Sequence, residues 1–266
     1  MPHRPLARAL VTLAATIATV LAGVLVPAAA QAAPAVHYVA LGDSYSSGVG
    51  AGPYDVSTCL RSQKSYAPLW AAANGVSSFR FPACGGAQTA DVLGRQLSVL
   101  SSSTTMVTIT IGGNDAGFSD VVTSCRFGSD STCTNAVNEA KAFAAAELPA
   151  RLDQTYAAIR DRAPNARLFV LGYPRLFENG WCGVLAMSNY KRTIINEAAN
   201  LLASVTADRA DTAGATFVDV RSVFAGHGVC GATPWIRDIT GVIEAYHPNA
   251  DGYRHGYLAA LTAATS

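Results

Sequence analysis

The chain has 266 residues, with 19 Lys and Arg against 18 Asp and Glu, so its formal net charge at pH 7 is only +1. Nucleic acids and anionic membrane surfaces attract proteins with an excess of basic side chains, so this balance gives no reason to expect either as a partner. The length suits one domain with a sizeable hydrophobic core.

The N-terminal segment is typical of a secretory signal peptide. Arg4 and Arg8 precede an apolar run over residues 9–26, and small residues follow it at positions 28–32. A membrane anchor is the alternative, because about 18 apolar residues approach the length of a membrane span. The small residues favour cleavage after Ala32. We therefore expect a signal peptide over residues 1–32, one domain over residues 33–266, and a secreted, extracellular protein with no stable membrane anchor.

Short apolar runs alternate with helical periodicity through the rest of the chain. Most of the runs meet Gly or a loop at one end, and we predict strands at residues 36–41, 79–83, 105–111, 168–171 and 215–220. Apolar residues at helical spacing predict helices around residues 148–159, 194–205 and 249–264. This alternation predicts an α/β fold, a three-layer α/β/α sandwich around a central parallel five-stranded sheet. Such folds bind ligands at the carboxyl ends of their strands.

Six cysteines follow the expected cleavage site. An even number in an exported chain indicates three disulfides. A zinc site is the competing use, but the sequence has no C-x-x-C or H-E-x-x-H spacing, so we expect no metal. Six cysteines allow 15 pairings. Among these we favour pairing in chain order: Cys59–Cys84, Cys125–Cys133 and Cys182–Cys230.

Chemically versatile residues come directly after the predicted strands or before the last helix. Ser44 follows the first strand, where a serine can stand on a tight turn or can merely cap the next helix. Gly86 follows the second strand, and its backbone N–H can approach a ligand closely because no side chain obstructs it. Asn114 follows the third strand and offers a side-chain amide. His247 precedes Pro248, which biases the histidine toward an extended backbone.

These segments resemble the four sequence blocks of the SGNH, or GDSL-type, hydrolases. The blocks are G-D-S near the N-terminus, a Gly after the second strand, G-x-N-D, and a C-terminal His, and all four occur here in order between residues 42 and 247. The chain also resembles secreted actinomycete lipases and phospholipases at residues 40–46, 109–118 and 171–174. The resemblance implies the flavodoxin-like SGNH hydrolase fold and the hydrolysis of esters.

The resemblance also implies a role for each matching residue. Ser44 would attack the ester carbonyl, and His247 would take its proton and return it to the leaving alcohol, with an acyl-enzyme between the two steps. The oxyanion hole would consist of the backbone N–H groups of Ser44 and Gly86 and the side-chain amide of Asn114. No cofactor is implied.

One position departs from the family pattern. Many members have an Asp three residues before the histidine, where it orients the imidazole, and this chain has Glu244 instead. In some actinomycete members a backbone carbonyl does the orienting. We favour a Ser–His pair oriented by a main-chain oxygen of Glu244 or Ala245, and the Glu244 carboxylate is the alternative.

The substrate is less closely defined by the sequence. An acyl pocket needs apolar walls, and the candidates are Phe118, Tyr173, Pro174, Leu176, Phe177, Trp181 and Trp235. We expect a lipase or carboxylesterase, a monomer that acts on a small-molecule or lipid ester. Phospholipase A and carbohydrate acetyl-esterase are the alternatives, although an acetyl group would not need an aromatic pocket. An inactive binding domain is the non-enzymatic alternative, and the intact set of four matching residues argues against it.

Overall fold

The computed structural model describes residues 1–2, 35–183, 186–239 and 243–266. The chain divides into two units, Met1–Pro34 and Ala35–Ser266. Apart from its first two residues, the expected signal peptide over residues 1–32 lies outside the described residues. Within the described ranges, no helix has both the length and the apolar character needed to cross a membrane.

A parallel sheet forms the middle of the second unit. Its strands are β1 (His37–Gly42), β2 (Ser78–Arg80), β3 (Met106–Thr110), β4 (Arg167–Leu171) and β5 (Thr216–Val218). The strand order is β2-β1-β3-β4-β5, and every neighbouring pair is parallel. The predicted five-stranded parallel sheet is therefore confirmed. The strand order reverses between β1 and β3, which is the point where such folds bind their ligands.

The second strand is shorter than its predicted range of 79–83. It ends at Arg80, because Pro82 has no N–H to donate to a neighbouring strand. The backbone beyond it stays beside β1, since the N–H of Ala83 donates to the carbonyl of Ala40 at 3.3 Å and that of Cys84 to the carbonyl of Gly42 at 3.0 Å. These two contacts place the segment after β2 beside the end of β1.

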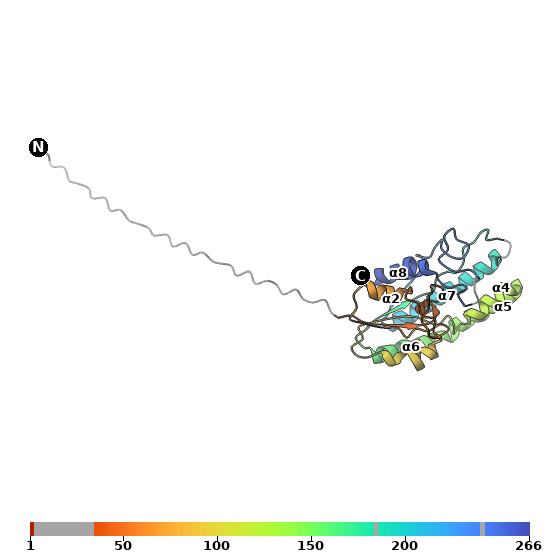
Figure 1. Cartoon of the computed structure of the whole chain (residues 1–266), viewed down its shortest axis with the longest axis horizontal. Coiled ribbons are helices and arrows are strands. Elements are labelled where there is room, and N and C mark those ends of the chain that lie inside the picture. Colours follow the sequence, from red (N-terminus) through yellow and green to blue (C-terminus); the bar gives the residue numbers. More distant parts are fainter. Residues whose placement is uncertain (3–34, 184–185, 240–242) are drawn as a thin grey trace. The chain divides into compact units, whose positions relative to one another are not determined.

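Helices cover both faces of the sheet. They are α1 (Ser44–Ser47), α2 (Tyr66–Ala73), α3 (Thr89–Asp91), η1 (Val92–Gln96), η2 (Leu97–Val99), α4 (Phe118–Phe127), α5 (Asp130–Ala146), α6 (Leu148–Arg162), α7 (Asn189–Thr212), η3 (Gly252–Tyr257) and α8 (Leu258–Thr265). Figure 1 shows α2 and α8 on one side of the sheet and α6 on the other. The predicted three-layer sandwich is confirmed.

The alternation of side chains along β1 explains the two layers. Tyr38 belongs to one core cluster together with Trp70 of α2 and Leu261 of α8. Its neighbour Val39 points to the opposite face and belongs to the other cluster, with Leu152 of α6. Because successive side chains of a strand face opposite ways, a strand buried on both faces is predominantly apolar.

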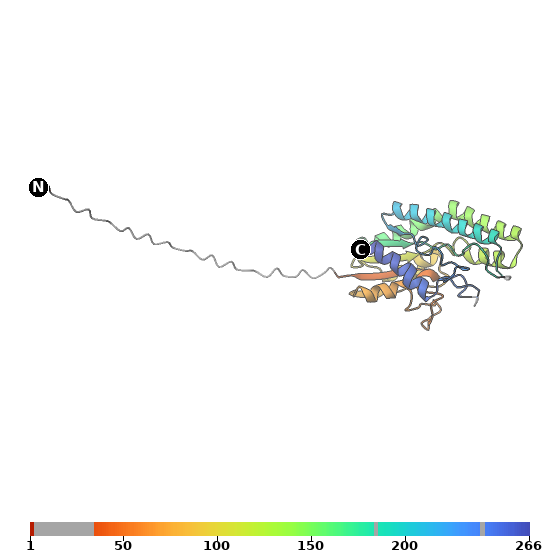
Figure 2. The same ribbon diagram turned by 90° about the horizontal axis from the view of Figure 1, so that it is seen from above.

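Helices α4, α5 and α7 form a group of their own. Helix α5 packs against both α4 and α7, and in Figure 2 the cyan α7 runs beside the yellow-green pair of α4 and α5. Helix α7 begins after Ser188, whose side chain accepts a hydrogen bond from the backbone N–H of Lys191 as an N-cap does. Pro149 stands in the first turn of α6, where its missing N–H removes no helical bond.

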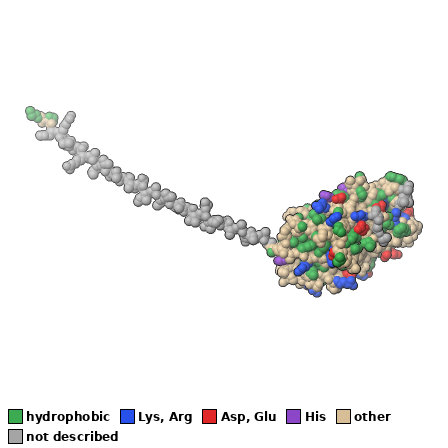
Figure 3. Space-filling model, in the orientation of Figure 1, with side chains coloured by type: hydrophobic (Ala, Val, Ile, Leu, Met, Phe, Trp, Pro, Cys, Tyr) green, Lys and Arg blue, Asp and Glu red, His purple; other side chains and the backbone are tan. Residues whose placement is uncertain are grey.

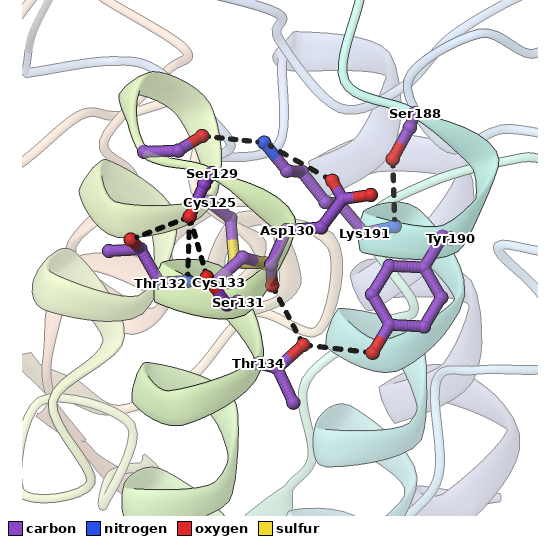
Figure 4. A network of polar contacts seen from close by, with 11 residues as sticks. Cys125, Ser129, Asp130, Ser131, Thr132, Cys133, Thr134, Ser188, Tyr190 and Lys191 are labelled. Carbon is purple, nitrogen blue, oxygen red and sulfur yellow. Dashed lines mark hydrogen bonds and ion pairs between the residues drawn. A yellow bond between two sulfur atoms is a disulfide. The ribbon is translucent and has the colours of Figure 1, made fainter.

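A disulfide and a lysine cross-link this helix group at the end where α7 begins (Figure 4). The Cys125–Cys133 bond joins α4 to α5. Lys191 of α7 reaches the turn between them, where its Nζ donates to the carbonyl of Gly128 at 2.8 Å and lies 3.7 Å from the Asp130 carboxylate. Its side chain is only 12% exposed. The three helices are thus cross-linked where α7 begins.

The disulfides follow the pairing favoured from the sequence. They join Cys59 to Cys84, Cys125 to Cys133 and Cys182 to Cys230. Next to the first of them, the backbone N–H of Gly85 donates to the carbonyl of Cys59 at 2.9 Å. This bridge therefore holds the Gly85–Gly86 turn that follows β2.

The surface carries charges of both signs. On the face shown in Figure 3, basic and acidic side chains are interspersed with polar and apolar ones and do not gather into a field of one sign. This distribution agrees with the near-zero net charge of the sequence. It gives this face no strong electrostatic attraction for a polyanion.

Candidate active site

Ser44 lies on a tight turn between β1 and α1. The turn begins at Gly42, whose φ is +120° and where an added Cβ would lie 2.3 Å from the carbonyl oxygen of Thr110, so only glycine fits. Asp43 is the N-cap of α1, and its side chain accepts from the backbone N–H of Tyr45 at 2.9 Å. Ser44 is the first residue of α1 and therefore stands at the carboxyl end of the sheet.

His247 lies beside Ser44, although 203 residues separate them. Its Nε2 is 2.8 Å from the Ser44 Oγ, and its Nδ1 is 2.9 Å from the carbonyl oxygen of Ala245. A carbonyl oxygen can only accept, so Nδ1 carries the ring proton and Nε2 is left to accept the hydroxyl proton of Ser44. Both side chains are 8% exposed. The pair has the geometry needed for a hydroxyl and its general base.

Burial keeps the imidazole neutral. It lowers the pKa of His247 from 6.5 to about 4, and the hydrogen bonds to the backbone of Ala245 and Glu244 offset part of that shift. A histidine with this pKa is unprotonated at neutral pH and can accept a proton. The same burial makes the charged imidazolium costly, so the contacts to backbone carbonyls matter when it forms.

The Glu244 carboxylate has its hydrogen-bond and ion-pair partners outside the imidazole. It accepts a hydrogen bond from the hydroxyl of Tyr54 and lies 3.4 Å from the Nε of Arg237. The main-chain oxygen of Glu244 accepts from the backbone N–H of His247 at 3.2 Å, and the same backbone helps to raise the pKa of the ring. Of the groups considered from the sequence, the carbonyl of Ala245 is the one at 2.9 Å from the ring nitrogen Nδ1.

Two further hydrogen-bond donors face the same cavity. The Asn114 side chain donates to the carbonyl of Ala87 at 2.9 Å, and an amide nitrogen has a second hydrogen, so one remains available. Gly86 has a φ of +77° and open space where a Cβ would lie. None of the described residues accepts a hydrogen bond from its N–H. The turns after β2 and β3 thus place donors beside Ser44.

A buried hydrogen-bond chain links the Ser44 turn to the turn after β3. The backbone N–H of Gly113 donates to the hydroxyl of Tyr173 at 2.9 Å, and that hydroxyl donates to the carboxylate of Asp43. Burial raises the pKa of Asp43 to about 7, although the hydrogen bonds from Tyr173 and Tyr45 oppose the rise. Tyr173, expected from the sequence to line the substrate pocket, therefore also braces both turns.

A cavity of about 280 Å³ opens over these groups. Its polar lining includes Ser44, Gly86, Asn114, Ser119, Thr123 and His247, and its apolar lining includes Val49, Leu60, Phe118, Val122 and Ile243. The four residues that the sequence analysis singled out for chemistry thus share one cavity. Parallel strands end at one edge of the sheet, and this is why segments far apart in sequence meet there.

The seven pocket candidates separate into two groups. Phe118, Tyr173, Pro174 and Leu176 line a second, apolar cavity of about 70 Å³, and Phe118 lines the 280 Å³ cavity as well. The other three line neither of these two cavities, which corrects the expectation from the sequence. Their aromatic rings are used elsewhere or face solvent.

The surroundings of each of these three side chains explain why it lines neither cavity. The backbone of Phe177 pairs with Val229, and its buried ring packs on Tyr246 at 5.4 Å between centroids, so it supports the loop before His247. Trp181 is 83% exposed. Trp235 stacks on His227 at 3.6 Å.

Tyr45 and Arg237 have roles in the site that sequence reasoning missed. The hydroxyl of Tyr45 donates to the carbonyl of Tyr246 at 2.6 Å, and its ring lies 5.1 Å from that of His247. The backbone N–H of Arg237 donates to the carbonyl of His247 at 2.9 Å, and its Nε donates to the carbonyl of Gly50. Tyr45 directly follows Ser44, so its place beside the G-D-S motif could have predicted a role in the site. No local sequence pattern distinguishes Arg237.

The fold and the paired serine and histidine at the carboxyl edge of its sheet are those of a serine hydrolase. Residues 40–255 match the GDSL-like lipase/acylhydrolase family. The chain is 47% identical to a lipase of Streptomyces rimosus over 98% of its own length and 99% of that protein, and 49% identical to Lipase 1 of Streptomyces coelicolor over 92% of each. This chain belongs to the GDSL-like lipase/acylhydrolase family and is an ester hydrolase.

Solved structures lead to the same family. A phospholipase A1 from Streptomyces albidoflavus NA297 superimposes with a TM-score of 0.84 at 49% identity, over 86% of this chain and 99% of that one. An extracellular lipase of Streptomyces rimosus gives the same TM-score and identity, over 86% of this chain and all of the other. The family resemblance predicted from the sequence is confirmed.

Proposed function

We propose that this protein is secreted and hydrolyses the acyl esters of lipids, with Ser44 as nucleophile and His247 as general base. The observation that carries the proposal is the 2.8 Å contact between Ser44 Oγ and His247 Nε2 at the floor of a cavity. In the first step His247 takes the proton as the Ser44 oxygen bonds to the ester carbonyl, and the proton then goes to the leaving alcohol. Water repeats the sequence on the acyl-enzyme and releases the acid.

The developing negative charge would be bound by three donors. These are the backbone N–H groups of Ser44 and Gly86 and the free N–H of the Asn114 amide. Ser44 begins a short helix, and Gly86 and Asn114 belong to turns tied to each other, since Asn114 donates to Ala87. Donors held in this way need no rearrangement when the charge appears, which is the source of their effect on rate.

The imidazolium formed in each step would be oriented by the carbonyl of Ala245. A carbonyl dipole at 2.9 Å from Nδ1 keeps the productive tautomer and partly offsets the positive charge. The Glu244 carboxylate would contribute at longer range and through the loop, because Tyr54 and Arg237 hold it. The catalytic unit is thus a serine, a histidine and a main-chain oxygen.

The proposal on location and substrate class has two supports. Residues 1–32 have the pattern of a cleaved signal peptide, and one structural relative is described as an extracellular lipase. The second candidate activity is that of a phospholipase A1, because a protein of that activity superimposes on this chain as well as the lipase does. Both substrates are acyl esters of glycerol and use the same chemistry.

The test compares four proteins on p-nitrophenyl butyrate. Ser44→Ala and His247→Ala should each lose activity by roughly 10⁴-fold or more, while folding like the wild type by circular dichroism. A fluorophosphonate probe should label the wild type and spare Ser44→Ala. Tyr190→Phe is the matched control, since Tyr190 is an exposed residue of α7 that lines neither cavity. Undiminished hydrolysis by Ser44→Ala would refute the mechanism.

Substrate class and secretion need their own measurements. Triolein, phosphatidylcholine and acetylated xylan should be offered side by side, and release of fatty acid from either lipid supports the proposal. Activity on acetylated xylan alone would contradict it. The full chain expressed in an actinomycete host should appear in the medium with an N-terminus at Ala33, as Edman sequencing would reveal.

A further inference from the structure

The second cavity lies directly behind the first. Phe118 and Val122 of α4 line both cavities, so their side chains form the wall between them. From this wall the 70 Å³ cavity extends among α4, α5 and α7, where its lining includes the small side chains of Ala140 and Ala198. The cavity therefore owes its space to the short side chains of two neighbouring helices.

The lining of this second cavity suits hydrocarbon. Tyr45 and Tyr173 present only their rings to it, because the first donates its hydroxyl to a backbone carbonyl and the second donates to a carboxylate. Lys141 is the one charged residue among the described residues that line it, and its Nζ lies 3.8 Å from the Glu197 carboxylate. An apolar cavity without polar partners stays dry and accepts apolar guests.

Phe118 stands between this cavity and the catalytic pair. Its ring centroid is 6.1 Å from that of His247 and 6.3 Å from that of Tyr45, edge to face in both cases. The side chain is partly exposed at the first position of α4. A change of rotamer at this one side chain would join the two cavities without movement of the backbone.

We infer that the second cavity binds the distal carbons of an acyl chain and that Phe118 admits them. The inference rests on the proposed function, because it requires the acyl group to be held at Ser44. The volume of about 70 Å³ is roughly half that of a ~150 Å³ apolar cavity that takes up benzene, so it holds roughly three carbon atoms. The enzyme then prefers acyl chains of medium length over short ones.

The walls of the cavity are held in place. The Cys125–Cys133 bond and the contacts of Lys191 cross-link α4, α5 and α7 at one end (Figure 4). A cavity with cross-linked walls keeps its volume, so longer chains gain nothing once it is full. Each methylene that enters should raise kcat/KM about fourfold, the equivalent of ~0.8 kcal/mol, until roughly three have been added.

The experiment measures kcat/KM on p-nitrophenyl acetate, butyrate, hexanoate, octanoate and decanoate. Ala198→Leu fills the cavity from α7 and should lower the octanoate-to-butyrate ratio by at least roughly tenfold, since leucine adds about three carbon atoms to the alanine side chain. Ala140→Leu should do the same from α5, which covers the case in which the first variant fails to fold. Phe118→Ala removes the partition and should raise the ratio. The matched control is Ala207→Leu, on the same helix as Ala198 and also partly buried, but outside the lining.

The outcomes separate the inference from the proposed function. Folded Ala198→Leu and Ala140→Leu variants that keep the wild-type ratio overturn the inference alone, as does an Ala207→Leu variant that lowers the ratio equally. A wild-type ratio near one also overturns it. If the wild type hydrolyses none of the esters, or Ser44→Ala retains activity, the proposed function fails and the inference fails with it.

Discussion

Replacing Glu244 by alanine distinguishes a catalytic unit of two side chains from one of three. The carboxylate accepts from the Tyr54 hydroxyl and pairs with Arg237 at 3.4 Å, while the ring nitrogen of His247 that an acid would contact is bonded to the Ala245 carbonyl. The substitution leaves that carbonyl in place. We therefore expect kcat to fall by less than about 10-fold, whereas loss of a true triad acid costs about 10⁴.

The same substitution should reduce stability by an amount that follows from its contacts. The side chains of Glu244 and Arg237 are 31% and 37% exposed, so their ion pair contributes about 0–1 kcal/mol. The Tyr54 hydrogen bond is also partly exposed and contributes about 1 kcal/mol. The free energy of unfolding should fall by about 1–2 kcal/mol, which lowers Tm by about 2–8 °C in a domain of this size.

The assay is kcat on p-nitrophenyl butyrate together with a thermal melt followed by circular dichroism. Tyr54→Phe is the matched control, because it removes the hydroxyl and leaves the carboxylate near the histidine loop. Both variants should lose stability and keep most of their activity. A 10⁴-fold loss of kcat in Glu244→Ala alone, with Tm changes alike in the two variants, would show that the carboxylate acts on His247 and would refute the reasoning.

Four other predictions follow from the site. Asn114→Ala should lower kcat by about 10²–10³ with an unchanged melting curve, and an unaltered kcat would remove it from the oxyanion hole. Tyr173→Phe strips a hydroxyl from two buried partners and should lower the unfolding free energy by about 2–4 kcal/mol in urea titrations; a loss below 1 kcal/mol contradicts this. Because catalysis needs neutral His247, whose pKa burial lowers to about 4, kcat/KM should persist below pH 6 and fall through about pH 4, and an acid limb centred at 6.5 would be inconsistent with burial. Reduction of the Cys59–Cys84 disulfide should lower activity while the far-ultraviolet circular dichroism spectrum stays unchanged. Full activity after verified reduction would show that the bridge does not hold the Gly86 turn.

Local patterns were sufficient to predict the sheet and the position of its chemistry. The runs around Tyr38 and Met106 consist mostly of apolar and β-branched residues without strict alternation, which is typical of a central parallel strand, and they form β1 and β3. Ser44 and Asn114 come directly after these strands. Because neighbouring parallel strands end at one edge, strand assignment alone brought both residues to the same cavity.

Local sequence patterns could not predict which carbonyl oxygen orients the His247 ring. Every residue has a carbonyl oxygen, so the one that contacts Nδ1 depends on how the loop bends. Here Tyr246 has a φ of +60°, which is uncommon for a residue with a side chain, and the hydroxyl of Tyr45 binds its carbonyl. The hydrogen bond joins segments that are 201 residues apart in the sequence, so no local pattern predicts it.

What the sequence alone determined is the set of elements and the residue types at their ends, because hydrophobic period, glycine and proline act within a few positions of themselves. Only the tertiary structure decided which apolar residues surround the substrate. Trp181 and Trp235 are aromatic like Phe118, yet one faces solvent and the other stacks on His227. Ala140 and Ala198 line the second cavity although their sequence context marks them as ordinary helix residues. Cavity walls arise where helices distant in sequence pack together, and that packing is a property of the whole fold.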